Sequence, residues 1–322
     1  MNFITGIYVI NAPASALNNS MGEETKAIVK SIRVQQRQYP YVSAQALRYW
    51  LRESVERHDP AWKAAPVYRG KGKQQAFTEG DPIRYWDDDL LGYMRAEKGE
   101  SITRIAPFRT STLVSAAPVE INDDFGVMAR ADGNPVLHGH EFYRATLVGM
   151  FSIDLGAVGT FTYRDRAGYR NLSAAQQEQA AELGLEHVPA LQAYRLPVQE
   201  RLRRVGSLLR ALGRLEGGAK QTLHHTDVSP SLVCMAVLRG GNNPFQYLVA
   251  PNPLPQIHLP ALDEALTVYR EDWLSGLVVG LRQGYMDESR AALVERQIVP
   301  LHPRQAFDAL ADELWAHEEW ME

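Results

Sequence analysis

The chain of 322 residues contains a single cysteine, Cys234. One thiol excludes an intrachain disulfide and any zinc site built from several cysteines. Cys234 lies in the apolar run SLVCMAVL, where no neighbouring positive charge would activate a thiolate. We therefore expect a buried, unreactive thiol.

Long apolar segments are also missing. No run reaches the ~18–20 residues that are needed to span a bilayer, and the N-terminal segment MNFITGIYVINAPAS lacks the basic residues of a secretory signal. We expect a cytoplasmic protein with no membrane partner. With 45% hydrophobic and 22% charged residues, the composition is typical of a globular protein.

Acidic residues are absent from Lys26 to Arg52, where the basic residues are Lys26, Lys30, Arg33, Arg37, Arg48 and Arg52. A second basic stretch runs from Arg195 to Lys220, whereas residues 261–322 are acidic. The net charge of the whole chain is −4, so basic residues do not outnumber acidic ones. They are instead concentrated in particular segments of the chain. A basic face on a neutral or acidic body is typical of phosphate binding. The alternative is a chance imbalance on solvated helices.

The order of expected elements indicates an α+β fold. Phe3–Ile10 is expected to form a strand that ends at Asn11 and Pro13, and Ser43 is expected to cap a helix that ends near Arg57. Two further strands, joined in a hairpin by a turn at DLGAVG, are expected at 140–152 and 160–163. Another strand is expected at 231–238, and a long basic helix at 191–215. This order of strand, helix, strand, strand, helix, strand is that of the ferredoxin-like βαββαβ unit, which is shared by RNA-recognition domains.

Other segments complete this expected organisation. Residues 58–140 are rich in proline, glycine and charge, and we expect an insertion in which Asp87, Asp88 and Asp89 are solvated. Ser173 and Gln176 form a plausible capping box. The remainder after residue 241 is expected to be helical.

The expected helix after Ser43 presents two different faces. Leu47, Trp50, Leu51 and Val55 share one side, which we expect to be buried, and Gln45, Arg48 and Arg52 share the other. Side-chain donors beside a helix N-terminus suit the backbone of a nucleic acid, and exposed rings such as Tyr39, Tyr41 and Tyr49 suit its bases. An ordinary solvated helix face is the alternative.

The loop that begins GGAKQT at Gly217 could contact phosphate through its backbone and Lys220. It lacks the spacing of a Walker A loop, so an ATPase is not indicated. A helix C-cap followed by a turn explains the glycines equally well.

Two histidine clusters suggest an enzyme as an alternative. His224, His225 and Asp227 could bind a metal ion in a metal-dependent nuclease, and so could His138, His140 and Glu141. Neither cluster has the i, i+4 histidine spacing of a helical zinc site, and neighbouring histidines in a strand point to opposite faces. No motif combines a nucleophile, a base and an oxyanion hole. The residues therefore favour binding over catalysis, and they imply no metal or other cofactor.

Five segments, in this order, resemble one known family: TGIYVINAPASALNN, KSIRVQQRQYPYVSAQALRYWLRE, TSTLVSAAPVEINDDFGVMAR, HEFYRATLVGMFSIDLGAVGTF and GGAKQTLHHTDVSPSLVCMAVLRG. The chain resembles the Cas-seven backbone subunit of type I CRISPR effector (Cascade) complexes, in its DevR/Cst2 (type I-B) branch, over about residues 3–245.

The resemblance implies a right-hand shape. An RRM-like palm would comprise residues 1–57 and 141–240, with a thumb loop at about 217–230. A finger or web insertion would comprise residues 58–140, and an acidic helical part, 241–322, would pack on the palm.

The resemblance also implies a non-catalytic function in antiviral defence. Copies would stack into a filament along a CRISPR RNA, with the thumb of each neighbour interrupting the row of bases. The guide bases would pair with a target DNA strand, and other Cascade subunits and a recruited nuclease would complete the complex. The segment EINDDFGVMAR would contact a subunit or the target strand. The expected RNA-binding residues are Asn18, Asn19, Lys26, Arg33, Arg37, Ser43, Gln45, Arg48, Arg109, Lys220, Gln221 and Thr222.

Overall fold

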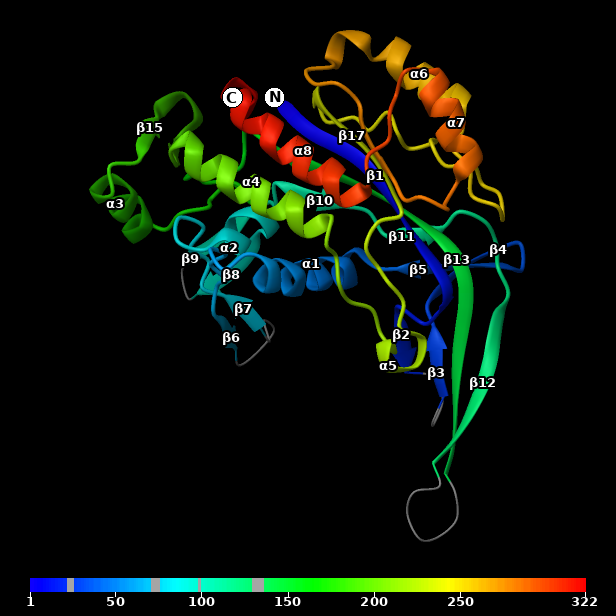
Figure 1. Ribbon diagram of the computed structural model, residues 1–322. Helices are drawn as coiled ribbons and strands as arrows, with labels where there is room; N and C mark the ends of the chain where they lie inside the picture. The colour runs from blue at the N-terminus through cyan, green and yellow to red at the C-terminus, as the bar shows by residue number, and fades with distance from the viewer. Residues whose placement is uncertain (22–25, 71–75, 98–99, 129–135) are drawn as a thin grey trace.

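The computed structural model describes residues 1–21, 26–70, 76–97, 100–128 and 136–322, and its centre is one large sheet (Figure 1). Strand β1 (Asn2–Ser15) lies between β13 (Val136–Asp154) and β17 (Leu232–Arg239), and both pairings are antiparallel. β1 continues through Pro13, so the expected strand end at Asn11 and Pro13 is wrong.

The sheet extends on both sides of this central trio. Its longest path runs β18 (Val278–Leu281), β17, β1, β13, β11 (Leu113–Ser115), β5 (Arg37–Val42), β4 (Ser31–Val34). Four more strands join through β13: β10 (Phe108–Thr110), β12 (Ile121–Met128), β3 (Lys26–Val29) and, through β3, β2 (Asn19–Met21).

The expected hairpin between residues 140–152 and 160–163 is wrong. β13 pairs instead with β10, β11 and β12, all of which come from the range 58–140. β14 (Thr160–Thr162) belongs to a separate small sheet with β16 (Ala193–Arg195) and β15 (Glu186–Val188). The sequence pattern identified two strands correctly but gave no information on their partners, because pairing is decided by contacts distant in the chain.

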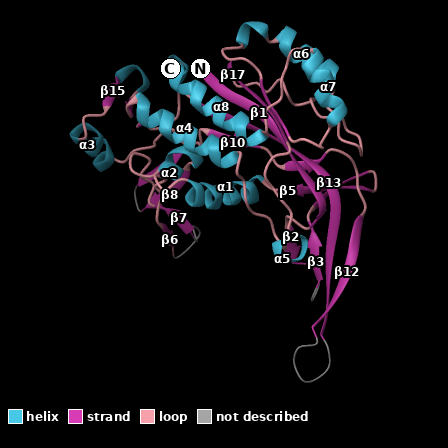
Figure 2. Ribbon diagram, viewed as in Figure 1, coloured by secondary structure: helices cyan, strands magenta, loops and turns pink. Residues whose placement is uncertain are grey.

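Helices cover both faces of the central sheet (Figure 2). Along β1, Ile4, Tyr8 and Ile10 face a core that also includes residues of α1 (Ala44–His58), α4 (Val198–Leu212) and α8 (Pro303–Ala316). Ile7 and Val9 point the other way, into a core shared with α6 (Leu259–Val268) and α7 (Asp287–Glu295). This alternation follows from the two-residue period of a strand and makes three layers.

Helix α1 agrees with its sequence pattern. Ser43 caps it, and Leu47, Trp50, Leu51 and Val55 are buried. The capping box of α3 (Ala174–Glu182) is also formed, by Ser173 and Gln176. The basic helix is shorter than expected, because α4 begins after Pro197 and ends at Leu212.

The remaining elements are short and lie mostly at one side of the sheet. They are β6 (Val67–Arg69), β7 (Ala76–Thr78), α2 (Trp86–Leu91), β8 (Tyr93–Glu97), β9 (Glu100–Arg104) and α5 (Gln221–His224), with 3-10 turns at Pro189–Leu191, Arg270–Asp272 and Glu318–Met321. Over the described ranges there are thus eight α-helices in a mixed α+β fold with antiparallel sheets. None of these helices is both long enough and apolar enough to cross a membrane.

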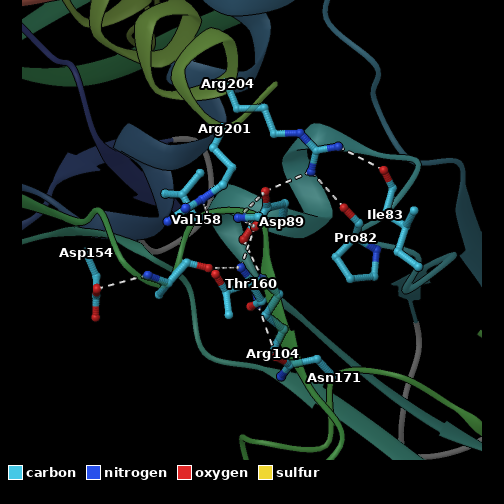
Figure 3. A network of polar contacts seen from close by, with 12 residues as sticks. Pro82, Ile83, Asp89, Arg104, Asp154, Val158, Thr160, Asn171, Arg201 and Arg204 are labelled. Atoms are coloured by element: carbon cyan, nitrogen blue, oxygen red, sulfur yellow. Dashed lines mark hydrogen bonds and ion pairs between the residues drawn. The ribbon is translucent and has the colours of Figure 1, made fainter. Parts of the chain in front are cut away.

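The aspartates of α2 are buried, and the expectation of a solvated surface is wrong. Asp87, Asp88 and Asp89 have exposed fractions of 5%, 1% and 0%. Asp89 accepts hydrogen bonds from Arg104, from Arg204 at 2.8 Å and from the Gly159 backbone N–H (Figure 3). Three arginines that a basic pattern would place in solvent, Arg104, Arg201 and Arg204, are buried around it. This network joins α2 and β9 to α4 and to the loop after β13.

Candidate nucleic-acid interface

The start of α1 offers hydrogen-bond donors to solvent. The Ser43 side chain accepts the Ala46 N–H at 3.3 Å, and the first turn contains no acidic residue. Gln45 is exposed, and Tyr49, one turn later, has an exposed fraction of 59%. A helix N-terminus without a carboxylate keeps its partial positive charge available to an anion.

Backbone hydrogen bonds connect this helix start to the loop after β1. The Lys30 N–H donates to the Asn18 carbonyl, and the Tyr41 N–H donates to the Lys30 carbonyl, both at 3.0 Å. Tyr41 precedes Ser43 by two residues, so Asn18, Lys30 and Ser43 lie on adjacent segments. The side chain of Lys30 makes no hydrogen bond or ion pair with any residue that the structure describes. We missed Lys30 as a site residue, although it belongs to the acid-free stretch.

A second loop, which begins at Gly217, contacts the loop after β1. The Ala219 N–H donates to the Leu17 carbonyl at 3.0 Å, which brings Lys220 beside Asn18. Asn18 has an exposed fraction of 7%, and its Nδ2 has no hydrogen-bond partner among the described residues; the same holds for Oδ1 of Asn19. Buried amide groups are normally hydrogen-bonded, so these two atoms are available to a ligand.

Two glycines allow this second loop to pack closely against Trp50 of α1 and against Leu17. Gly217 has φ 149°, and a Cβ there would lie 2.4 Å from Cγ of Trp50 on α1. Gly218 has φ 98°, and its Cβ would lie 2.6 Å from Cδ2 of Leu17. The glycines therefore pack the loop against the protein itself, and Lys220 follows them at the start of α5.

Some expected RNA-binding side chains turn inward. Arg48 is partly buried and donates to the carbonyls of Leu91 and Phe108, the latter at 3.3 Å. Burial lowers the pKa of Arg48 to about 10, so it remains charged at neutral pH. Gln221 donates to the carbonyls of Gly217 and Thr226. Arg48 thus ties α1 to α2 and β10, and Gln221 holds its own loop. The side chain of Arg52, one turn after Arg48, makes no hydrogen bond or ion pair with the described residues and is only partly buried.

The other expected residues lie farther from this centre or are neutralised. Lys26 forms ion pairs with Asp123 at 2.7 Å and Glu141 at 3.2 Å. Arg33 and Arg37 are exposed on the β4–β5 hairpin, and Thr222 is exposed on α5. Arg109 lies on the opposite side of β10 from the buried Phe108, which packs in the same core as α1. The structure therefore groups Asn18, Asn19, Ser43, Gln45 and Lys220 and leaves Arg109 apart.

A model of the CRISPR-associated negative auto-regulator DevR/Csa2 family matches residues 4–253. The chain belongs to this family. The match confirms the resemblance to the DevR branch that the sequence indicated. A search of curated proteins gives no match.

Two solved chains share the fold of this DevR/Csa2 family member. They are described as "CRISPR RNA-guided surveillance complex, pre-nicking" and "CRISPR RNA-guided surveillance complex", with TM-scores of 0.56 and 0.53 and sequence identities of 12% and 13%. In each case the alignment covers 97% of this chain and 99% of the solved chain. At these identities the likeness concerns the fold.

The histidines of this DevR/Csa2 chain do not converge with Asp227. His224 packs against the rings of His140 and Phe142, whereas the Asp227 carboxylate is held by Arg282 at 2.8 Å and by Ser229. His225 is exposed at the end of α5. Over the ranges that the structure describes, no group of three or more His, Cys, Asp or Glu side chains is arranged to hold a metal ion.

A long hairpin of β12 and β13 projects from the body of the molecule (Figure 1). Phe125, Val127 and Leu137 have exposed fractions of 72%, 56% and 64%. Phe125 pairs with Gly139 and Val127 with Leu137, so the three side chains share one face of the hairpin. An apolar face of this kind on a projecting arm is typical of a contact surface.

Proposed function

We propose that this protein is the CRISPR RNA-binding backbone subunit of a type I (I-B-like) Cascade surveillance complex and has no catalytic activity of its own. The observation that carries the proposal is the set of backbone hydrogen bonds that joins Ala219 to Leu17, Lys30 to Asn18 and Tyr41 to Lys30. It gathers two lysines, two incompletely bonded asparagines and a helix N-terminus on one surface. Family membership supports the CRISPR association.

This surface suits the sugar-phosphate backbone of single-stranded RNA. Ammonium groups, amides and backbone N–H donors bind phosphates and hydroxyls without reading base edges. Bases that remain free can pair with a target DNA strand. The guide RNA would lie across the start of α1, with Ser43, Gln45, Lys30 and Lys220 along it and Arg33 and Arg37 extending the track.

The palm of the proposed right hand consists of β1, β11, β13 and β17 with α1 and α4. In this sheet β1 lies between β13 and β17, and β11 lies outside β13, as expected for an RRM-like βαββαβ unit. The expected finger would then be the part of 58–140 that carries α2 and β6 to β9. The acidic part after residue 241 covers the other face of the palm.

The β12–β13 hairpin is a better candidate than loop 217–230 for the arm that reaches a neighbouring copy. Loop 217–230 is held against Leu17 and Trp50, whereas the hairpin projects and exposes Phe125, Val127 and Leu137. Successive copies linked in this way would form a filament along the guide. Other Cascade subunits would bind its ends, and a recruited nuclease would cleave the target.

Co-purification with RNA tests the proposal. The chain should be expressed with a CRISPR array and its partner subunits, and the RNA that remains bound should be quantified and sequenced. The double variant Gln45→Ala/Lys220→Ala should lose most of this RNA, and binding should fall with salt, with a logarithmic slope reduced by roughly one for the lost cation. Arg270→Ala, which removes an exposed arginine of the 3-10 turn at Arg270–Asp272, is the matched control. Full retention of guide RNA by the double variant would contradict the proposed site.

The metal-dependent nuclease that uses His224, His225 and Asp227 remains the alternative. It predicts cleavage of RNA or DNA by the purified chain on addition of Mg²⁺, Mn²⁺ or Zn²⁺, abolished by Asp227→Ala. The ion pair between Asp227 and Arg282 favours the binding function instead.

A further inference from the structure

A separate pocket of about 520 Å³ lies on the other side of β10 from the interface around α1. Its lining comes from the loop before β10, the segment that follows β13, β14, and residues 164–171 and 191–195. This volume is within the range of small-molecule sites.

Four arginines line this pocket, and three of them, Arg109, Arg164 and Arg195, lie outside the buried network of Arg104. Arg109 is half exposed, lies 5.7 Å from the Phe3 ring and 3.8 Å from Asp154, and donates no hydrogen bond among the described residues. Arg164 donates to the carbonyls of Leu191 at 3.1 Å and Ala190 at 3.2 Å, and its remaining N–H groups make no hydrogen bond with the residues that the structure describes. Arg195 forms an ion pair with Glu322 at 3.1 Å.

Two unpartnered polar atoms meet on one wall. Thr160 pairs with Arg195 across β14 and β16, so their side chains share a face of this small sheet. Thr160 has an exposed fraction of 6%, and its Oγ1 has no partner among the described residues; Nε of Arg195 also has none. Two buried donors on the same face, both without an acceptor among the described residues, can donate to a ligand oxygen.

The floor of the pocket is rigid. Arg104 uses all five of its N–H groups, on Asp89, Ala157, Thr160 and Asn171. Its partners Thr160 and Asn171 line the pocket and are seen beside it in Figure 3. A fully bonded arginine fixes these groups before any ligand arrives.

The rim is apolar. Ile105, Tyr169 and Leu191, with exposed fractions of 54%, 37% and 39%, all line the same pocket. Arg166 stacks on Tyr169, with its guanidinium carbon 4.8 Å from the ring centre. A flat ring with apolar neighbours suits an aromatic base.

We propose that this pocket binds a nucleotide with a single phosphate. The phosphate would contact Arg109, Arg164 and Thr160, and the base would lie against Tyr169, Ile105 and Leu191. The charge of Arg104 is balanced by Asp89, and Asp154 and Glu322 also line the pocket, so the other three arginines leave a small net positive charge. That balance favours one phosphate over a triphosphate. The nucleotide is either free or a unit of a strand, and the site does not depend on the guide RNA lying along α1.

Calorimetric titration of the purified chain at low salt tests this inference. The probes are AMP, UMP, inorganic phosphate and a uridine tetranucleotide. We expect AMP or UMP to bind, phosphate alone to bind more weakly, and Arg109→Ala and Tyr169→Ala each to weaken nucleotide binding by about tenfold, the effect of one charge-assisted or stacking contact. Arg270→Ala should change nothing. Loss of mononucleotide binding in Gln45→Ala but not in Arg109→Ala would place the nucleotide at the start of α1 and contradict the inference.

Each outcome decides the inference. If only the tetranucleotide binds and Arg109→Ala weakens it, the pocket takes a nucleotide of a strand. If no probe binds at millimolar concentration, or if Arg109→Ala binds as the unmodified chain does, the inference is wrong. The Arg109 side chain makes no hydrogen bond with the described residues and only a 3.8 Å ion pair with Asp154, so its variant should melt close to the temperature of the parent. Arg164→Ala would then serve as a second test, with its folding checked by circular dichroism.

Discussion

Arg204 on α4 and Asp89 on α2, 115 residues apart in the chain, form an ion pair of 2.8 Å in which both side chains are almost completely buried. The Asp89 carboxylate is shared with Arg104 and with the Gly159 N–H, and Arg204 also donates to the carbonyls of Pro82 and Ile83. This arrangement joins the part of the chain around α2 to the helix layer of the main sheet. Burial of ions is tolerated here because almost every donor has an acceptor.

Removal of the shared carboxylate should destabilise the fold strongly. Asp89→Ala leaves Arg104 and Arg204 buried without their anion, and we expect a loss of about 3–5 kcal/mol in the free energy of unfolding. Urea unfolding followed by circular dichroism measures this value. Asp312→Ala breaks an ion pair with Arg210 in which Asp312 is 71% exposed, and it should cost under about 1 kcal/mol. Equal effects of the two variants would contradict the role assigned to the buried network.

Stability should depend on pH through Asp88. Burial raises the pKa of Asp88 from its ordinary 3.8 to about 6, although Thr78 and the Asp81 N–H donate to it. The folded protein thus holds this proton more tightly than the unfolded chain does, and the resulting stability is present below pH 3.8 and lost as pH rises through about 6.

The variant Asp88→Asn cannot titrate at this position. The free energy of unfolding of the unmodified chain, minus that of Asp88→Asn, should fall by up to about 3 kcal/mol between pH 3.5 and 7. Urea titrations across this range give the difference. Parallel pH profiles for the two proteins would show that Asp88 does not titrate in this window.

A side chain at Gly217 should disturb both folding and the RNA interface. In Gly217→Ala the new Cβ would lie 2.4 Å from the Trp50 ring at a φ of 149°, so the loop that carries Lys220 must move away from α1. We expect a loss of about 1–3 kcal/mol and weaker RNA retention. Gly276→Ala meets no atom within 4 Å and is the control. Melting temperature and bound RNA should be measured on the same preparations, and an unchanged melting temperature for Gly217→Ala would show that the loop adapts freely.

The apolar face of the β12–β13 hairpin should govern self-association and not folding. In Phe125→Ser/Leu137→Ser the replaced side chains are 72% and 64% exposed, so the melting temperature should change little. On RNA, however, the variant should form fewer contiguous arrays, as measured by analytical ultracentrifugation and electron microscopy. Val268→Ser, at a 71% exposed position on α6, is the matched control. Arrays of normal length from the double variant would exclude the hairpin as the contact.

Local signals in the sequence predicted local structure well. Ser43, the capping box of Ser173 and Gln176, and the four apolar positions of α1 each concern residues within one or two turns of each other. The helical repeat and the capping preferences of nearby residues are enough to predict such local features. Cys234 was also predicted correctly, because burial raises the pKa of its thiol and it lies in the core of β17.

Features that depend on distant partners were not predictable in this way. Asp87, Asp88 and Asp89 look like a solvated acidic run until Arg204, far along the chain, is known to reach Asp89. Likewise, periodicity places Arg48 on the outer face of α1 but cannot show that the carbonyls of Leu91 and Phe108 lie within its reach. The pairing of β13 with β11 depends on the same kind of long-range contact.

Strand β13 runs unbroken for 19 residues, from the core beside β1 to the projecting hairpin, a length of roughly 60 Å. Its inner half is bonded to β1, β10 and β11, and its outer half to β12 and β3. Because no hinge separates the two halves, a load applied near the tip is transmitted as shear into the middle of the sheet. A row of copies held together by such arms would resist bending. Any bend would have to deform the central sheet of each subunit, because no flexible linker lies between the arm and the sheet.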